Sequence, residues 1–282
     1  EEARLGNLYT QQAYELCRRL EFKNLLGRFD AEAVPENTIE QNFFVCSELS
    51  GVEALFEKAA RNSMAGIALI ADKNNVYGLG IALEKEEVYY IPAEGLLSGE
   101  YLCEKLRKLG EATVISAMDI KMLLKYVESL EPERVFDLGI GAYLLNPLKS
   151  SYTYEDIARE YIGGISIPSR EELLGKDTYE KAWEKSSENM GICACYQAFT
   201  AYAAREKTEA KLKETGMWQV YTDIELPLVF TLDSMEKCGI CVKGEELKAY
   251  GERLSVRIRE LEKLIYEKAG EEFNINSPKQ LG

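Results

Sequence analysis

Between residues 43 and 92, short apolar runs alternate with polar turns. Runs of roughly four to eight residues that are rich in β-branched and aromatic side chains, with turn-forming residues at both ends, are typical of strands. Asn74-Asn75 and Lys85-Glu86 fit two of the tight turns. We therefore predict strands over Phe43–Cys46, Gly66–Ala71, Val76–Leu83 and Glu87–Pro92.

After residue 97 the apolar positions recur at helical spacing, in segments that alternate with two further strand-like runs. Ser98, Asp119 and Thr153 stand directly before such segments and are residue types that cap helices; Asp156 strengthens the cap at Thr153. The predicted elements are a helix from Ser98 to Leu109 that Gly110 ends, a strand Ala112–Ser116, a helix Ile120–Leu130, a strand Arg134–Phe136, a helix Asp137–Leu145, a helix reaching Tyr161, and a helical region Asp177–Lys213 broken near Gly191. Strands followed by alternating helices and strands predict an α/β layer fold with a mixed sheet.

Both ends of the chain have helical patterns. Leu8–Phe29 carries a leucine stripe, and the polar, proline-containing stretch Asp30–Gln41 after it suits a linker. Near the other end, Thr222 and Glu225 predict a capping box for a helix that ends at Gly239.

A long amphipathic helix is predicted beyond that point. It follows a short predicted strand, Ile240–Val242, and Gly270 ends it. Ser277 then fits the N-cap of a further helix, with Gln280 closing a capping box. Because the sequence stops inside this last helix, we expect the natural protein to continue beyond Gly282. The apolar seam of the long helix consists of Leu247, Leu254, Ile258, Leu261, Ile265 and Ala269.

Composition narrows the possible chemistry. The chain has 282 residues, of which 46% are hydrophobic and 29% charged, and this suits a soluble globular protein. No apolar run approaches the roughly 18 to 20 residues of a membrane-spanning helix. The absence of histidine excludes Ser–His–Asp and Cys–His catalysis. Seven cysteines, an odd number, favour a reducing cytoplasm over a disulfide framework, so we expect a cytoplasmic protein.

The net charge is −14. Affinity for nucleic acid phosphates comes mainly from Lys and Arg, so we expect the chain alone to bind DNA weakly or not at all. We further expect a monomer with no membrane contact.

Four segments resemble bacterial family A DNA polymerases. The segments Ile224–Leu247 and Ala269–Gly282, which read IELPLVFTLDSMEKCGICVKGEEL and AGEEFNINSPKQLG, closely resemble the start of the polymerase domain. FDLGIGAYLLNP, at Phe136–Pro147, is similar to a strand–helix junction in the 3′–5′ exonuclease domain of that family. The stretch Leu8–Phe29 resembles the segment that joins the 5′-nuclease region to the exonuclease domain.

The resemblance implies three parts: a linker and helix over residues 1–41, a ribonuclease-H-like 3′–5′ exonuclease domain over 42–214, and the α-helical start of the thumb over 215–282. It implies a parent protein that is a DNA-directed DNA polymerase in DNA replication and repair, with Mg²⁺ as its cofactor and duplex primer-template DNA as its partner. We expect no cofactor in this segment itself. By resemblance, the residues at the thumb tip that contact the DNA backbone are Asn274, Asn276, Ser277 and Lys279.

Proofreading in this family resembles two-metal hydrolysis, which needs several acidic ligands around two cations. The family has Asp-x-Glu on the first central strand and an Asp near the start of the helix after the fourth strand. Here Ile70 stands in the place of the first acid, and Asp72 matches the second. Ile120 stands in the place of the third, with Asp119 one position earlier.

The family also has Tyr-x-x-x-Asp on a late helix, where this chain has Asn189 and Cys193. We therefore predict no catalytic residue and no bound metal, and a non-catalytic exonuclease-like domain. The alternative is a residual metal-dependent 3′–5′ exonuclease that uses Asp72 and Asp119. The structural interpretation of the same two residues is a turn former at Asp72 and a helix N-cap at Asp119.

The cysteines offer one more metal hypothesis. Cys238-Gly-Ile-Cys241 has the spacing of a zinc knuckle or redox pair, and Cys193-x-Cys195 could complete a four-thiolate set. No second C-x-x-C pair exists, and cysteines beside a turn also serve as small apolar residues. We therefore expect no zinc site.

Overall fold

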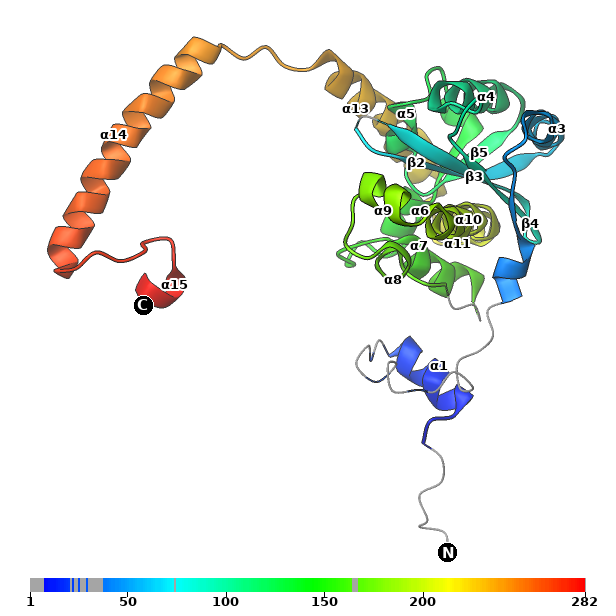
Figure 1. Cartoon of the computed structure of the whole chain (residues 1–282), viewed down its shortest axis with the longest axis horizontal. Coiled ribbons are helices and arrows are strands. Elements are labelled where there is room, and N and C mark those ends of the chain that lie inside the picture. Colours follow the sequence, from blue (N-terminus) through cyan, green and yellow to red (C-terminus); the bar gives the residue numbers. More distant parts are fainter. Residues whose placement is uncertain are drawn as a thin grey trace, which may run out of the picture. The chain divides into compact units, whose positions relative to one another are not determined.

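The computed structural model of the chain describes residues 8–20, 22, 25, 29, 38–73, 75–163 and 167–281 (Figure 1). The chain forms two compact units, Glu1–Ser234 and Met235–Gly282. The first unit contains a six-stranded sheet in the order β1-β4-β3-β2-β5-β6. The strands are β1 (Phe43–Val45), β2 (Met64–Ala71), β3 (Val76–Glu84), β4 (Glu87–Pro92), β5 (Val114–Ala117) and β6 (Val135–Asp137).

The sheet is mixed, as predicted. The pairs β2–β3 and β3–β4 are antiparallel, as expected for strands joined by tight turns, whereas β1–β4, β2–β5 and β5–β6 are parallel. All the strands predicted between residues 43 and 136 are present, with bounds that differ by a few residues.

Helices cover both faces of this sheet (Figure 1). Successive residues of a strand point to opposite faces, so Ile67 belongs to one apolar cluster while Ala68 and Ile70 belong to the other. The first cluster includes buried residues of α3 (Leu49–Ala59) and α4 (Gly99–Ala112). The second cluster is built around α10, a helix over Ser187–Ala203 that supplies more of its buried residues than any other element.

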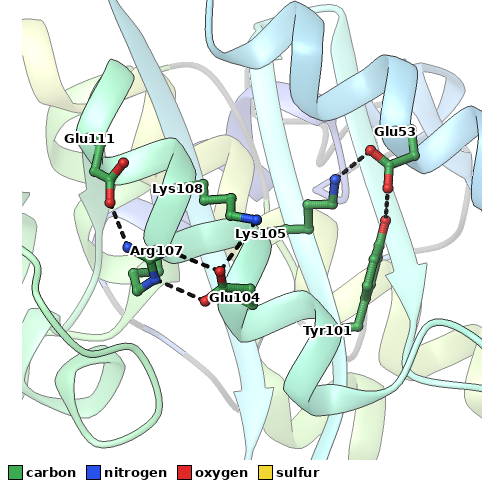
Figure 2. Close-up of polar contacts among 7 residues, drawn as sticks. All are labelled: Glu53, Tyr101, Glu104, Lys105, Arg107, Lys108 and Glu111. Carbon is green, nitrogen blue, oxygen red and sulfur yellow. Dashed lines mark hydrogen bonds and ion pairs between the residues drawn. The ribbon is translucent and has the colours of Figure 1, made fainter.

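Helix α3 is absent from the predicted elements. Its buried residues recur at helical spacing, but the segment also carries exposed polar residues and no cap: the side chain of the N-cap residue Glu48 makes no capping hydrogen bond. Once folded, α3 is tied to α4 through Glu53, which accepts hydrogen bonds from Tyr101 Oη (2.5 Å) and from Lys105 Nζ (Figure 2). These hydrogen bonds, that of Lys105 first, hold the pKa of Glu53 below its usual range.

Helix α4 also carries an ion-pair network along its own surface. Arg107 donates to both oxygens of Glu104, at 2.8 and 2.9 Å, and to Glu111 at 2.5 Å (Figure 2). The first of these contacts lowers the pKa of Glu104 to about 2. All these groups face water, so they define the helix surface more than they stabilise the fold.

Three predicted helix caps are confirmed. The side chain of Ser98 accepts a hydrogen bond from Tyr101 N, that of Asp119 from Met122 N, and that of Thr153 from Asp156 N. The helices that follow are α4, α5 (Ile120–Leu124) and α7 (Tyr154–Ile157). Helix α5 is shorter than the predicted Ile120–Leu130, and a few residues beyond it Ser129 has a left-handed backbone with φ of 62°, which no helix accommodates.

The two glycines predicted to interrupt helices lie inside them. Helix α4 continues past Gly110. A Cβ at this position would lie 2.5 Å from Leu130 Cδ2, so the glycine permits close packing here and does not end the helix. Gly191 lies within α10 for the same reason, against the ring of Tyr90. The break in this region falls at Ser186, where α9 (Tyr179–Lys185) ends and α10 begins. The remaining helices here are α6 (Leu138–Leu145), the π-helix η4 (Ala158–Ile162), α8 (Arg170–Leu174) and α11 (Arg205–Glu214).

Two predictions near Thr222 and Ile240 are wrong. Helices α12 (Trp218–Val220), η5 (Tyr221–Glu225, a π-helix) and α13 (Leu226–Cys238) follow one another without a break. Thr222 lies inside this run, with its hydroxyl donating to Trp218 O at 3.1 Å, so it caps nothing. Residues 240–242 form no strand in the described part of the chain, which offers them no partner strand.

The second unit contains the predicted long helix, α14 (Gly244–Ala269). It ends at Gly270, whose φ of 80° only glycine adopts readily. A short helix, α15 (Pro278–Leu281), follows. Gln280 accepts a hydrogen bond from Asn274 N at 2.8 Å, whereas a capping box would have it accept from Ser277 N.

At the N-terminal end, α1 (Gln11–Arg19) lies within the predicted helical stretch. The predicted linker lies mostly outside the described residues, and its end forms the short helix η2 (Thr38–Asn42). The predicted domain boundaries at 41/42 and 214/215 rest on resemblance and remain predictions; the division between compact units falls after Ser234. None of the helices in the described ranges has the length and apolar character that crossing a bilayer requires.

Candidate functional site

A cavity of about 160 Å³ lies in the first unit, where β2 and β5 end near α5. Its walls come from these two strands, from the loop and helix after β5, and from α9 and α10. This is the place where sequence resemblance puts a metal-dependent nuclease site. The lining residues are Ile67, Ala68, Leu69, Ala71, Ala117, Met118, Asp119, Met122, Leu123, Tyr126, Tyr179 and Gln197.

Asp119 is the carboxylate of this lining. It is exposed, and its Oδ1 accepts a hydrogen bond from Met122 N at 2.9 Å, so the predicted N-cap role is confirmed. The preceding residue of β5, Ala117, and the following Ile120 are both buried. The carboxylate therefore stands at the rim of the cavity, above an apolar interior.

Asp72 is held in a turn. Its Oδ2 accepts a hydrogen bond from Tyr77 Oη at 2.7 Å and its Oδ1 one from Asn75 N at 3.0 Å. Its backbone is bonded as well, because Asp72 N donates to Asn75 O and Tyr126 Oη donates to Asp72 O. Burial, and then the hydrogen bond to Asp72, raise the pKa of Tyr77 to about 12. The predicted turn role is confirmed, and Asp72 is not among the cavity-lining residues.

The positions at which the family has acids are filled by packing. Ile70 and Cys193 are 1% and 0% exposed and belong to one apolar cluster with Tyr154. Ile120 is also fully buried, in the other cluster. Burial raises the pKa of the Cys193 thiol, whose sulfur accepts a hydrogen bond from Gln197 Nε2 at 3.3 Å. Asn189 is exposed and donates to Leu173 O at 3.2 Å.

Asp137 is a buried carboxyl group that the sequence interpretation assigned only to the start of a helix. It caps α6 through Ile140 N at 2.9 Å and also accepts from Ile120 N at 2.8 Å, so it joins two helix starts. Burial is the largest cause that raises its pKa, to about 7. The backbone of Asp137 makes two hydrogen bonds with the hydroxyl of Tyr221. Asp137 N donates to Tyr221 Oη at 2.6 Å, and Tyr221 Oη donates to Asp137 O at 3.2 Å. An Asp directly before an apolar helical segment was the signal for the cap.

No group of three or more His, Cys, Asp and Glu side chains in the described ranges is arranged to hold a metal ion. The residues around the cavity therefore do not fit a two-metal site, which needs several carboxylates. The cysteines are equally dispersed. Cys193 and Cys195 are buried in α10, whereas Cys238 and Cys241 are exposed residues of the second unit.

The four predicted DNA-contacting residues lie in one turn of the second unit. Asn276 N donates to Asn274 Oδ1 at 3.1 Å, and Ser277 N donates to Asn274 O at 2.9 Å. Phe273, next to this turn, packs edge-on against Tyr266 of α14 with ring centroids 5.9 Å apart. Lys279 is exposed. The turn is thus internally bonded, and its contact with DNA remains a prediction.

The fold resembles those of several solved structures. The POL domain of Pol1 from M. smegmatis, in complex with DNA primer-template and dNTP, superposes with a TM-score of 0.60 at 19% identity, covering 84% of this chain and 39% of that one. Brucella melitensis NrnC bound to pGG superposes with a TM-score of 0.51 at 14% identity, covering 71% of this chain and 96% of that one. At these identities the likeness shows the fold alone.

Sequence comparison gives a consistent result, although no family model matches the chain. DNA polymerase I of Bacillus subtilis is 35% identical over 150 residues, which are 52% of this chain and 16% of that protein. DNA polymerase I of Pseudomonas aeruginosa is 26% identical over 298 aligned residues, 95% of this chain and 32% of that protein. The chain thus spans no more than about a third of the length of these relatives. The first unit has the ribonuclease-H-like exonuclease fold, and the sequence of the chain is similar to a part of bacterial DNA polymerase I.

Proposed function

We propose that the first unit is a non-catalytic exonuclease-fold domain that serves as a rigid structural platform within a DNA-directed DNA polymerase acting in DNA replication and repair. The observation that carries the proposal is the apolar packing at Ile70, Ile120 and Cys193, the positions at which the family has acids. Two-metal hydrolysis needs several carboxylates converging on two cations. A cavity with one carboxylate at its rim cannot assemble such a site.

The chemistry of the remaining acids supports the same conclusion. Both oxygens of Asp72 accept hydrogen bonds inside its own turn, and one oxygen of Asp119 caps α5. Mg²⁺ demands near-octahedral oxygen ligation, and two hydrogen-bonded carboxylates supply too few of the oxygens that a two-metal site needs. We therefore assign the two residues structural roles.

The alternative function is a residual metal-dependent 3′–5′ exonuclease. It is supported by the position of Asp119 at the cavity. A cation there would depend on water for nearly all its ligands, and such a site would be weak.

For the parent protein we propose the activity of its relatives, with Mg²⁺ as cofactor and duplex primer-template DNA as partner. The Pol1 neighbour was solved with DNA primer-template, which supports this partner. In the second unit we propose backbone contacts to that DNA from the turn that contains Asn274, Asn276, Ser277 and Lys279. The net charge of −14 argues that the chain alone binds DNA weakly.

The test is a time course with end-labelled single-stranded DNA, in Mg²⁺ and separately in Mn²⁺. The matched control is the chain carrying Asp72→Ala and Asp119→Ala, purified in the same way. We expect identical, background-level degradation by both proteins. Divalent-dependent shortening from the 3′ end by the wild type that the double variant lacks would overturn the proposal and favour the exonuclease.

A further inference from the structure

The cavity beside Asp119 has the features of a small-molecule site. Its lining includes aliphatic residues of β2 together with Met118, Met122, Tyr126 and Tyr179. Thioethers are polarisable and make favourable contacts with aromatic rings. A ring that entered this space would therefore lie among two methionines and two aromatic residues.

The two aromatic walls are fixed before any ligand arrives. The hydroxyl of Tyr126 donates to the backbone oxygen of Asp72 in its closed turn. The ring of Tyr179 has the guanidinium of Arg170 stacked on it, 4.7 Å from its centroid. Walls that are already in place spare a ligand the free energy of ordering them.

The size of the cavity matches a single ring. Its volume is about 160 Å³, and an apolar cavity of roughly 150 Å³ is known to accommodate benzene. Water in a space lined mostly by Ile, Leu, Ala and Met side chains has few hydrogen-bond partners. Its displacement by an apolar group is therefore favourable.

The rim carries a negative charge. Asp119 lines the cavity and uses Oδ1 to cap α5, which leaves its second oxygen available to a ligand. The net charge of −14 adds a general preference for cations over anions. We propose that this cavity is a binding site for a small aromatic amine, with the ring among the methionines and tyrosines and the ammonium group at Asp119.

The probe is benzylamine, and its binding to the intact chain is measured by ligand-observed NMR. For a ligand of this size we expect a dissociation constant on the order of 1 mM. Benzyl alcohol, the neutral analogue, should bind several-fold more weakly. Equal binding of the two, or no saturable binding of benzylamine, would contradict the proposal.

A pair of methionine variants locates the site. Met122→Trp fills the cavity from its exposed side and should abolish benzylamine binding. Met217→Trp is the matched control, because Met122 and Met217 are 40% and 37% exposed and only Met122 lines the cavity. Binding that survives Met122→Trp, or is lost equally in both variants, would place the ligand elsewhere and overturn the proposal.

Asp119→Asn tests the role of the charge. Asparagine caps helices as well as aspartate does, so the fold is retained. The variant should bind benzylamine and benzyl alcohol equally, through loss of the several-fold preference for the amine. A preference that persists in the variant would contradict the assignment of the ammonium group to Asp119.

Discussion

The buried carboxyl group of Asp137 is costly to ionise in the folded state. Its side chain is 3% exposed, and it accepts hydrogen bonds from backbone N–H groups, among them those of Ile120 and Ile140. Neutral donors compensate only part of the desolvation of a carboxylate. Burial first, with the charge of nearby Asp119 as a further contribution, raises the pKa of Asp137 to about 7.

Such a group makes stability depend on pH. The folded pKa lies above the unfolded value of about 4, so the stabilisation is complete below pH 4 and is lost as the pH rises through about 7. We expect the free energy of unfolding contributed by this residue to fall by about 2 kcal/mol between pH 5 and pH 8. Urea unfolding of wild type and Asp137→Asn at both pH values measures it: the wild type should lose more stability than the variant. Parallel losses would show that Asp137 is ionised throughout.

Ile70 gives a second prediction at this scale. It is 1% exposed and packs in the cluster with Tyr154 and Cys193. Ile70→Asp buries a carboxylate there, and we expect a loss of about 3 kcal/mol or more in the free energy of unfolding. The control Ile70→Val should cost about 1 kcal/mol.

Adding Mn²⁺ to the Ile70→Asp variant distinguishes an apolar packed site from a site that can still bind a metal. If the cavity cannot gather ligands, Mn²⁺ will not restore the stability of Ile70→Asp in urea unfolding. A stabilisation by Mn²⁺ that Ile70→Val does not share would contradict this account.

Individual roles were predictable from sequence where the partner is local. Asp119 and Asp72 bond within three to five residues of themselves, and both roles follow from residue type and position. Asp137 shows the limit. Its cap to Ile140 is local and could have been predicted, but its second donor and the hydroxyl of Tyr221 come from distant parts of the chain.

At the level of elements, the contact of α10 with the sheet depends on glycines. A Cβ added at Gly66 would lie 2.3 Å from Ala198 O, and one at Gly80 would lie 2.4 Å from Ala194 O. Both contacts are with helix backbone, which cannot move aside as a side chain can. The helix therefore lies directly on β2 and β3, at a distance that only glycine permits.

Gly80→Ala should therefore destabilise the first unit by about 2 kcal/mol or more. Gly251→Ala in α14 is the control, since a Cβ there meets nothing within 4 Å. Both tryptophans, Trp183 and Trp218, lie in the first unit, so urea unfolding followed by tryptophan fluorescence reports on that unit. We expect a lower midpoint for Gly80→Ala and an unchanged one for Gly251→Ala. An unchanged midpoint for Gly80→Ala would mean that α10 can move away from the sheet.

The same contacts explain which elements sequence patterns predicted. Each strand of the described residues was predicted, because short apolar runs between turn residues are a local signal, although the same signal also predicted a strand at Ile240–Val242 that is absent. Gly110 and Gly191 were taken as breaks because glycine often ends helices, yet tertiary contacts with Leu130 and Tyr90 require them inside helices. Helix α3 was missed, since its stability comes from burial against the sheet and not from a cap.

At the scale of the whole molecule, the chain combines an exonuclease fold with apolar packing at the positions where the resemblance places acids. The ribonuclease-H-like sheet and its covering helices are intact, with a continuous core on both faces. This combination fits the proposed role of a structural platform within a longer polymerase.

The central claim, that this fold holds no divalent metal site, is tested most directly by titrating the chain with Mn²⁺ and following free Mn²⁺ by electron paramagnetic resonance. The comparison is Asp72→Asn with Asp119→Asn, which keeps both side-chain shapes and removes both charges. We expect the two proteins to bind Mn²⁺ alike, with only the weak, diffuse association of an acidic surface. One or two tight sites in the wild type that disappear in the double variant would contradict the account.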